Sequence, residues 1–320
     1  MTALTTAARP AADRHGPDLR ALLIAAAGGH HLRLTGQDTT VRDMLAERLV
    51  RLMPGMDLAT RIEADRIPGH TPGRAVPLVQ LRRGATLTTV LGRVGPAGDR
   101  PGAASLAHGG VLYVTDSAQV PAAAARALIE VLESGEVAFE SARRTATGTV
   151  LRIVRFPARF TLLLGAPACP CALTDCVCPP HRRTAPWGHI LPTLQDRIDL
   201  KAGAPDRAHE DWSVPTASEV GQVVEARTRA LWRMSGTPWT TNSHVPPADR
   251  RTWPALPDVA AEYLRELLAA GTLTVRGVDR SHRVAWTIAD LDGLDRPGPA
   301  QVAEAVAYRL GVAHPERAAD

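Results

Sequence analysis

The segment LTGQDTTVRDMLAERL, residues 34–49, decides how the whole chain is interpreted. The apolar stretch from His31 to Thr35 predicts a short strand, and apolar residues at helical spacing predict a helix over 40–52. Between them stands Gly36, at the place where many nucleotide-binding proteins carry a glycine-rich phosphate loop. No lysine follows within the segment, which therefore predicts a nucleotide-binding architecture without the cation that such a loop uses.

Strands and helices alternate on both sides of this segment. A helix is expected at 19–27, and the continuous apolar run at 109–116 ends in polar residues, as a buried parallel strand does. Residues 57–105 predict loops and a hairpin, with a β-leaning piece at 86–92. The chain then predicts, in order, a helix at 121–134 and strands at 136–141, 150–157 and 159–167. The fold class is therefore α/β, with three layers built on a mostly parallel sheet.

The last third of the chain predicts helices only. They are expected at 217–232, 257–270, 275–291 and 300–310, after a proline-rich stretch at 203–215. We therefore divide the chain into a disordered leader at 1–16, an α/β core at 17–207, an all-helical lid at 208–312 and a tail at 313–320.

Composition narrows the function classes. The 320 residues are 45% hydrophobic and 4% aromatic, which is typical of a globular chain with one large domain or two ordinary ones. No apolar run of about 18 residues and no export pattern occur, so we expect a cytoplasmic protein that does not enter a membrane. The net charge of +4 comes from arginine, because Lys201 is the only lysine. Such an excess permits contact with nucleic acid without requiring it.

Six stretches carry a resemblance to a known family: IAAAGGHHLRLTG (24–36), SLAHGGVLYVTD (105–116), LESGEV (132–137), PARFTLLLGAPACPC (157–171), LQDRIDL (194–200) and DRSHRVAWTIADL (279–291). From about residue 17 to 312 the chain resembles the ComM/YifB group of magnesium-chelatase-like AAA+ ATPases. The resemblance implies an AAA+ core of the phosphate-loop type, a helical lid, and assembly with like or unlike AAA+ subunits. Most members carry a Lon-like domain ahead of the ATPase, and we expect no counterpart of it here.

The phosphate loop departs from the family pattern. Members read GPPGSGKTMLA where this chain reads GQDTTVRDMLA, so the resemblance implies that Gly36 is the retained glycine. Thr39 and Val41 stand for the later glycines, Arg42 for the phosphate-binding lysine and Asp43 for the Mg²⁺-binding hydroxyl. A β-branched residue resists positive φ, arginine is not a point donor, and a carboxylate repels phosphate. Gly36, Arg42 and Asp43 are the candidate nucleotide contacts, but these losses favour the interpretation that Arg42 and Asp43 belong to an exposed first helical turn.

The apolar run at 109–116 shows the same kind of loss. The family reads VLFLDE there, with an aspartate that holds Mg²⁺ and a glutamate that activates water, whereas this chain has Thr115 and Asp116. One carboxylate cannot fill both roles. The asparagine that orients water in the family corresponds to Pro167, which has no side-chain donor.

Two arginines of the family pattern are retained. The resemblance implies that Arg197, in LQDRIDL, is the arginine finger that reaches a neighbouring subunit's active site. It also implies that Arg276 is the helical-domain arginine that contacts nucleotide. The alternative interpretation for either is a structural ion pair, for example of Arg197 with Asp196 or Asp199.

A candidate metal site is formed by four cysteines: Cys169, Cys171, Cys176 and Cys178. Four thiolates so close together can bind a structural Zn²⁺ tetrahedrally in a reducing compartment. The C-x-C spacing is tighter than that of usual zinc ribbons, so reduced thiols or a disulfide remain alternatives. His181 is an alternative ligand, whereas His30, His31 and His108 predict packing or loop positions.

These losses predict a pseudo-ATPase that acts through assembly or by supplying an arginine finger to a partner. Two alternatives remain open: a slow ATPase that binds ATP and Mg²⁺ and is coupled to DNA or protein remodelling, and an interaction scaffold that needs no nucleotide. A further hypothesis is that Trp239 and Trp253, close to Arg250 and Arg251, stack on nucleic-acid bases. The alternative is that these tryptophans pin the helices of the lid.

Overall fold

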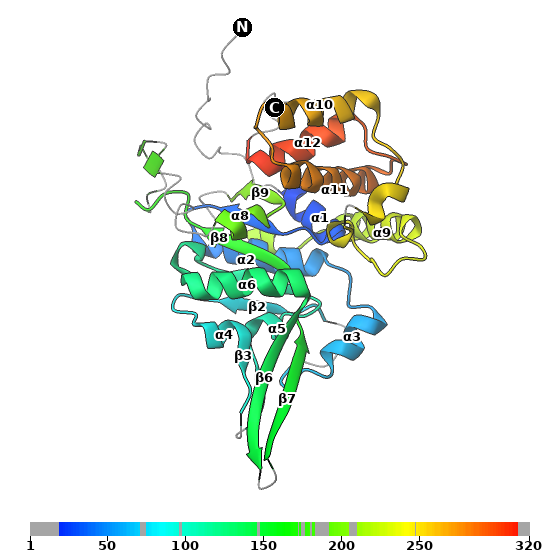
Figure 1. Cartoon of the computed structure of the whole chain (residues 1–320). Helices are drawn as coiled ribbons and strands as arrows, with labels where there is room; N and C mark the ends of the chain where they lie inside the picture. The colour runs from blue at the N-terminus through cyan, green and yellow to red at the C-terminus, as the bar shows by residue number, and fades with distance from the viewer. Residues whose placement is uncertain are drawn as a thin grey trace.

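The computed structural model describes residues 19–70, 75–95, 98–145, 148–171, 173, 177–179, 181–182, 192–204, 210–246 and 248–312. Figure 1 shows a layered α/β body, a two-stranded ribbon that projects from it, and a group of helices packed against the opposite end. Among the described residues, no helix is both long and apolar enough to cross a bilayer.

The centre of the described body is a parallel sheet of five strands. Their spatial order is β2 (Leu78–Leu81), β5 (Val111–Val114), β8 (Thr161–Ala166), β1 (Leu32–Thr35) and β9 (Leu200–Gly203). Every neighbouring pair is parallel, with Leu32 opposite both Leu163 and Leu200. All carboxyl ends therefore lie along one edge, where the residues that follow β1, β5 and β8 come together.

Helices cover both faces of this sheet. α1 (Leu19–Gly28) and α2 (Thr39–Leu52) pack on one face in a core cluster that includes Leu163. α6 (Ala122–Ser134) packs on the other face, in a second cluster that includes the next strand residue back, Leu162. Alternate residues of a buried strand thus face opposite layers. The α/β class with three layers is confirmed.

The region before β5 holds more helix than the sequence predicts. Its elements are α3 (Leu58–Ala64), α4 (Leu87–Leu91), β3 (Gly92–Arg93), β4 (Arg100–Pro101) and α5 (Ala103–Leu106). The short hairpin of β3 and β4 agrees with the prediction, but the β-leaning interpretation of 86–92 is wrong. Thr86 and Thr89 form a capping box at the start of α4, each hydroxyl accepting the other residue's backbone N–H at 3.2 Å. This cap outweighs the β propensity of the segment.

The strands β6 (Glu136–Thr145) and β7 (Gly148–Pro157) form an antiparallel ribbon of their own. Their pairing runs from Glu136 opposite Pro157 to Thr145 opposite Gly148, which leaves a connection of two residues. A connection this short can join strands only as an antiparallel hairpin. The two predicted strands are therefore present but lie outside the parallel sheet, in the ribbon that projects in Figure 1.

The C-terminal part of the described chain is helical. Its long helices are α9 (Ala217–Arg233), α10 (Asp258–Ala269), α11 (Val275–Asp292) and α12 (Pro299–Leu310), which correspond to the four predicted ones. The predicted domain boundary near residue 208 lies outside the described residues and stays a prediction.

Trp253 lies in the core of the helical region. Its side chain is 8% exposed, and its ring centroid is 5.4 Å from that of Trp286. The guanidinium of Arg233 lies 5.0 Å from the centroid of the Trp253 ring. The Nε1 of Trp239 donates to the carboxylate of Asp249 at 2.6 Å. Because Trp253 is buried, it cannot stack on a nucleic-acid base, and the alternative that it pins the helices is the correct one.

A buried polar network joins the sheet to the helical region. Asp199, just before β9, is 2% exposed and accepts the backbone N–H of His31 at 3.1 Å and Nη1 of Arg280 at 2.6 Å. His30 Nε2 lies 2.7 Å from Oγ1 of Thr287 on α11. Burial alone would raise the pKa of Asp199, but Arg280 and His30 hold it well below its ordinary value. This network fixes α11 at the amino edge of β1 and β9.

We expect acid to destabilise the protein through His31. Burial lowers the pKa of His31 to about 3, and its Nδ1 accepts the backbone N–H of Leu162 at 3.0 Å. In the unfolded chain a histidine has a pKa of about 6.5. Below that pH the unfolded state therefore binds more protons than the folded state, and unfolding is favoured. Between about pH 7.5 and about 5.5 this site should cost about 1.4 kcal/mol.

Urea unfolding of the native protein and of His31→Gln, at both pH values, measures this difference. The glutamine variant should lose less stability in acid by that amount, because it cannot take up the proton. An equal acid-induced loss in both proteins would contradict the assignment.

Candidate functional site

The loop after β1 is closed on itself and on the sheet. Asp38 caps α2, with its Oδ1 accepting the backbone N–H of Thr40 at 2.7 Å. The backbone N–H of Gly36 donates to the carbonyl of Ala166, at the end of β8, at 3.2 Å. A Cβ on Gly36 would lie 2.8 Å from the Cβ of Ala204 and 2.9 Å from its carbonyl oxygen. Close packing therefore requires glycine here, and the N–H of this glycine is already bonded within the protein.

Arg42 is the buried cation of this loop. Its side chain is 3% exposed and folds back to donate to the carbonyl oxygen of Gly36 and, at 2.9 Å, to Oγ1 of Thr39. The guanidinium therefore joins the start of the loop to the first turn of α2. The favoured interpretation of Arg42 as an exposed residue of that turn is wrong, because the loop's own acceptors stabilise its charge inside the protein.

Asp43 lies beside Tyr113 of β5. Tyr113 is fully buried, and burial together with the nearby Asp43 carboxylate raises the pKa of its hydroxyl. One carboxylate oxygen of Asp43 is also withdrawn from solvent. The position that the family gives to a Mg²⁺-binding hydroxyl therefore presents a partly buried carboxylate against a phenol.

The residues after β5 are drawn toward β2. The backbone N–H and Oγ1 of Thr115 donate to the carbonyl of Leu81 at 3.0 and 3.3 Å. The carboxylate of Asp116 accepts from Nε of Arg83 at 3.1 Å. Because β2 and β1 lie on opposite sides of β5, this ion pair draws Asp116 away from the side of the sheet on which Arg42 lies.

The two retained arginines lie together at the opposite edge of the sheet. Arg197 follows α8 (Pro192–Asp196), precedes β9 and pairs with Glu133 near the end of α6. Burial lowers the pKa of Arg197, and the nearby Arg280 and Arg276 lower it further. The side chain of Arg276 is 72% exposed, with Nη1 3.6 Å from a carboxylate oxygen of Asp196.

This placement separates the predicted nucleotide contacts into two groups. Gly36, Arg42 and Asp43 lie at the carboxyl edge of the sheet, whereas Arg276 lies near Arg197 at the amino edge. The ion-pair partner of Arg197 is Glu133, a residue that sequence proximity did not indicate. The role of each residue in binding nucleotide stays a prediction.

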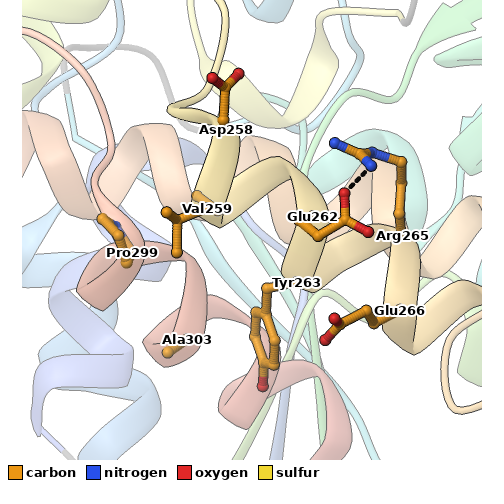
Figure 2. Close-up of a pocket in the computed structure, with 9 residues that line it drawn as sticks. Asp258, Val259, Glu262, Tyr263, Arg265, Glu266, Pro299 and Ala303 are labelled. Carbon is orange, nitrogen blue, oxygen red and sulfur yellow. Dashed lines mark hydrogen bonds and ion pairs between the residues drawn. The ribbon is translucent and has the colours of Figure 1, made fainter.

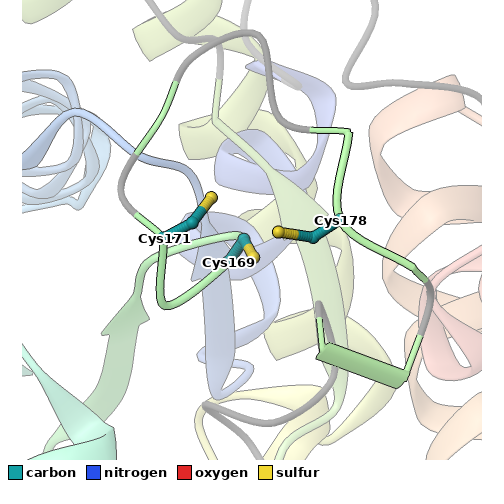
Figure 3. A group of neighbouring side chains, drawn as sticks. All are labelled: Cys169, Cys171 and Cys178. Atoms are coloured by element: carbon teal, nitrogen blue, oxygen red, sulfur yellow. The ribbon is translucent and has the colours of Figure 1, made fainter.

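The cysteine loop follows β8 at the carboxyl edge. Figure 3 shows the side chains of Cys169, Cys171 and Cys178 converging, and their sulfur atoms all lie within 4.8 Å of one another. Zinc–sulfur bonds of about 2.3 Å in a tetrahedron place sulfurs about 3.8 Å apart, so the three thiolates fit a zinc ion. Cys176, the fourth predicted ligand, lies outside the described residues, and His181 is not part of the described group.

Gln37 connects the cysteine loop to the phosphate-loop position. Its Nε2 donates to the carbonyl of Cys169 at 3.2 Å and to that of Leu173 at 3.3 Å. Sequence reasoning missed this residue, because a glutamine between two loops carries no motif. The same holds for Tyr113, Arg83 and Glu133, whose partners are far away in the chain.

A separate open hollow lies on the helical region, between α10 and α12 (Figure 2). Its volume is about 830 Å³, and its lining includes Val259, Glu262, Tyr263, Glu266 and Pro299. None of the predicted site residues lines it. The predicted site residues therefore lie away from this hollow, at the edges of the sheet.

The fold and the loop after β1 define the class of protein. A parallel sheet in this strand order, with a phosphate-loop position after β1 and a helical region that follows the sheet, is the architecture of an AAA+ core with its lid. Residues 15–211 match the family model of the magnesium chelatase subunit ChlI, and residues 214–309 match the model of the ChlI C-terminal region. The chain belongs to this magnesium chelatase family, and the resemblance to its ComM/YifB group is confirmed.

Similar proteins cover most of the chain. It is 36% identical over 309 residues to the uncharacterized protein Rv2897c of Mycobacterium tuberculosis, covering 90% of this chain and 59% of that protein. It is 29% identical over 318 residues to the competence protein ComM of Haemophilus influenzae, covering 92% of this chain and 58% of that protein. The chain thus spans less than two thirds of the length of these relatives.

Among solved structures, a full-length MCM homolog from Methanopyrus kandleri aligns with a TM-score of 0.48 and 18% identity. The alignment covers 92% of this chain and 54% of that one. This likeness is too weak to bear on function.

We expect about one zinc ion per purified chain. Cys169→Ser should lose the metal, because a hydroxyl is a far poorer zinc ligand than a thiolate, and its thermal midpoint should fall since metal binding contributes to folding. Elemental analysis and melting curves check both, with Thr228→Ser at an exposed position of α9 as the control. Equal zinc content in the two variants would exclude Cys169 as a ligand.

Proposed function

We propose that this chain is a pseudo-ATPase of the magnesium chelatase family that acts by assembling with other AAA+ subunits. The observation that carries the proposal is the position of Arg42. Its guanidinium is buried and bonded to Gly36 and Thr39, so the loop holds its own cation instead of presenting it to a phosphate. Binding of a triphosphate in the family manner would require these bonds to break.

The backbone of the loop supports the same conclusion. A phosphate loop binds oxygens through several free N–H groups, and glycines allow the conformations that point them inward. Here the N–H of Gly36 is bonded to Ala166, the N–H of Thr40 is bonded to Asp38, and Val41 replaces a glycine. These two N–H groups are therefore engaged within the protein instead of being offered to a phosphate group.

The acidic position after β5 supports loss of hydrolysis. ATP hydrolysis needs one group that holds Mg²⁺ and another that positions the attacking water. Asp116 is the one carboxylate at the two family positions, and its pairing with Arg83 draws it toward β2. Thr115 bonds back to Leu81 and has no acidic group.

The location of Arg197 and Arg276 supports a role in a neighbour's site. They lie at the amino edge of the sheet, away from their own loop after β1 at the carboxyl edge, which favours a role outside that loop. An arginine finger acts on charge that develops in an adjacent subunit, and such a group is worth a factor of about 10³ to 10⁵ in turnover. The zinc centre, on this proposal, is structural.

A mixing experiment tests the function. Alone, the chain should release no phosphate from Mg²⁺-ATP above the buffer rate, because the single carboxylate of Asp116 cannot both hold Mg²⁺ and position the attacking water. Mixed with an intact ATPase of the same family, the chain should raise the partner's ATP turnover. The increase caused by the Arg197→Ala variant should be at least about tenfold smaller than the increase caused by the native chain. Arg265→Ala, at an exposed arginine of α10, serves as the matched control.

Two outcomes would contradict the proposal. Mg²⁺-dependent phosphate release by the chain alone would favour the slow ATPase. Partner turnover that is the same with the native chain, with Arg197→Ala and without any added chain would favour a scaffold that does not complete a neighbour's site.

A further inference from the structure

We propose that the cysteine metal centre, acting through Gln37, holds the loop after β1 in its closed conformation. On this inference metal occupancy, rather than nucleotide, sets the state of the loop. It rests on the proposed function only in taking the loop to be free of nucleotide. Gln37 is a positioning residue in this scheme, because it bonds to the cysteine loop and not to the metal ligands' sulfur atoms.

Two hydrogen bonds join the two loops, and a third joins the loop after β1 to the end of β8. The backbone N–H of Gly36 donates to Ala166 at the end of β8, and the Nε2 of Gln37 donates to the carbonyls of Cys169 and Leu173. The first bond belongs to the sheet edge and needs no metal. The two bonds from Gln37 reach into the cysteine loop itself, so they require that loop to hold its shape.

The orientation of the Gln37 amide follows from its partners. Both neighbours are carbonyl oxygens, which only accept hydrogen bonds, so the NH₂ group and not the Oε1 must face them. One donor group can satisfy both carbonyls only if they stay at a fixed separation. The cysteine loop is therefore required in one conformation, and not merely nearby.

Metal is the element that can fix this conformation. From Cys169 to Leu173 the described residues lie in no helix or strand, and the side chain of Leu173 is 62% exposed. Little packing therefore restrains the loop at Leu173, whereas Cys169 is buried. A metal bound by Cys169, Cys171 and Cys178 would cross-link it on both sides of Leu173 and remove much of its conformational freedom.

The effect reaches Arg42 through a single peptide. Gly36, whose carbonyl accepts from Arg42, is the residue before Gln37. When Gln37 is held, this carbonyl is held toward Arg42; when Gln37 is released, the carbonyl is free to turn. Loss of metal should therefore loosen the bond that closes the loop, and the first turn of α2 should become more mobile.

Hydrogen exchange on the full chain tests this inference. Amides of residues 36–41 are compared in the zinc-loaded protein, the protein after chelation, and zinc-loaded Gln37→Glu. The glutamate is nearly the same shape but puts acceptors against two carbonyls, so its bonds cannot form. Gln222→Glu, at an exposed position of α9, is the matched control.

Exchange within residues 36–41, followed at Thr40 whose N–H is bonded to Asp38 in the closed loop, should rise at least about tenfold both on chelation and in Gln37→Glu, while the control matches the native protein. Elemental analysis should find the same zinc content in Gln37→Glu as in the native chain, and amides of β5 should stay slow throughout. This combination separates a local release of the loop from general unfolding.

Native exchange at residues 36–41 in zinc-loaded Gln37→Glu would overturn the inference. So would loss of zinc from that variant, since Gln37 would then act on the metal site and not on the loop. Phosphate release is measured separately on the native chain, so ATPase activity would overturn the proposed function and leave the exchange result standing on its own.

Discussion

The hydrogen bonds from the Arg42 guanidinium to the Gly36 carbonyl and the Thr39 hydroxyl are the central constraint on this site. In a buried place a guanidinium needs acceptors, and here the loop after β1 supplies them from its own atoms. The positive charge of Arg42 is thus bound by the loop itself. The phosphate-loop position becomes a closed turn that supports the start of α2, and the hydrophobic core beneath α2 is retained.

The two edges of the sheet differ in how their charged groups are engaged. At the carboxyl edge Gly36 packs on Ala204, and Asp116 pairs with Arg83, so both residues have partners within the protein. At the amino edge the buried Asp199 network fixes α11 to the sheet, and Arg276 remains largely exposed. We therefore connect the proposed function to the amino edge, where charge can still reach a neighbouring subunit.

Sequence patterns predict the elements of this fold well and the contacts of its site poorly. Buried strands and amphipathic helices show their period in the chain, and the missing lysine is visible by inspection. The direction of the Arg42 side chain is not, because it depends on a carbonyl and a hydroxyl placed by the fold. The contacts of Gln37 with Cys169 and of Arg197 with Glu133 join residues far apart in sequence, so motif spacing cannot predict them. The sequence did not predict α4, which Thr86 caps, because its capping box consists of threonines, which favour β-structure.

A crystal structure of the chain grown with Mg²⁺ and a non-hydrolysable ATP analogue at millimolar concentration would show whether the loop after β1 can hold a nucleotide. We expect the Arg42 guanidinium to stay bonded to the carbonyl of Gly36, with no triphosphate bound to the loop. A Mg²⁺–triphosphate bound against the Gly36 backbone, with Arg42 turned outward to hold it, would contradict the proposed function.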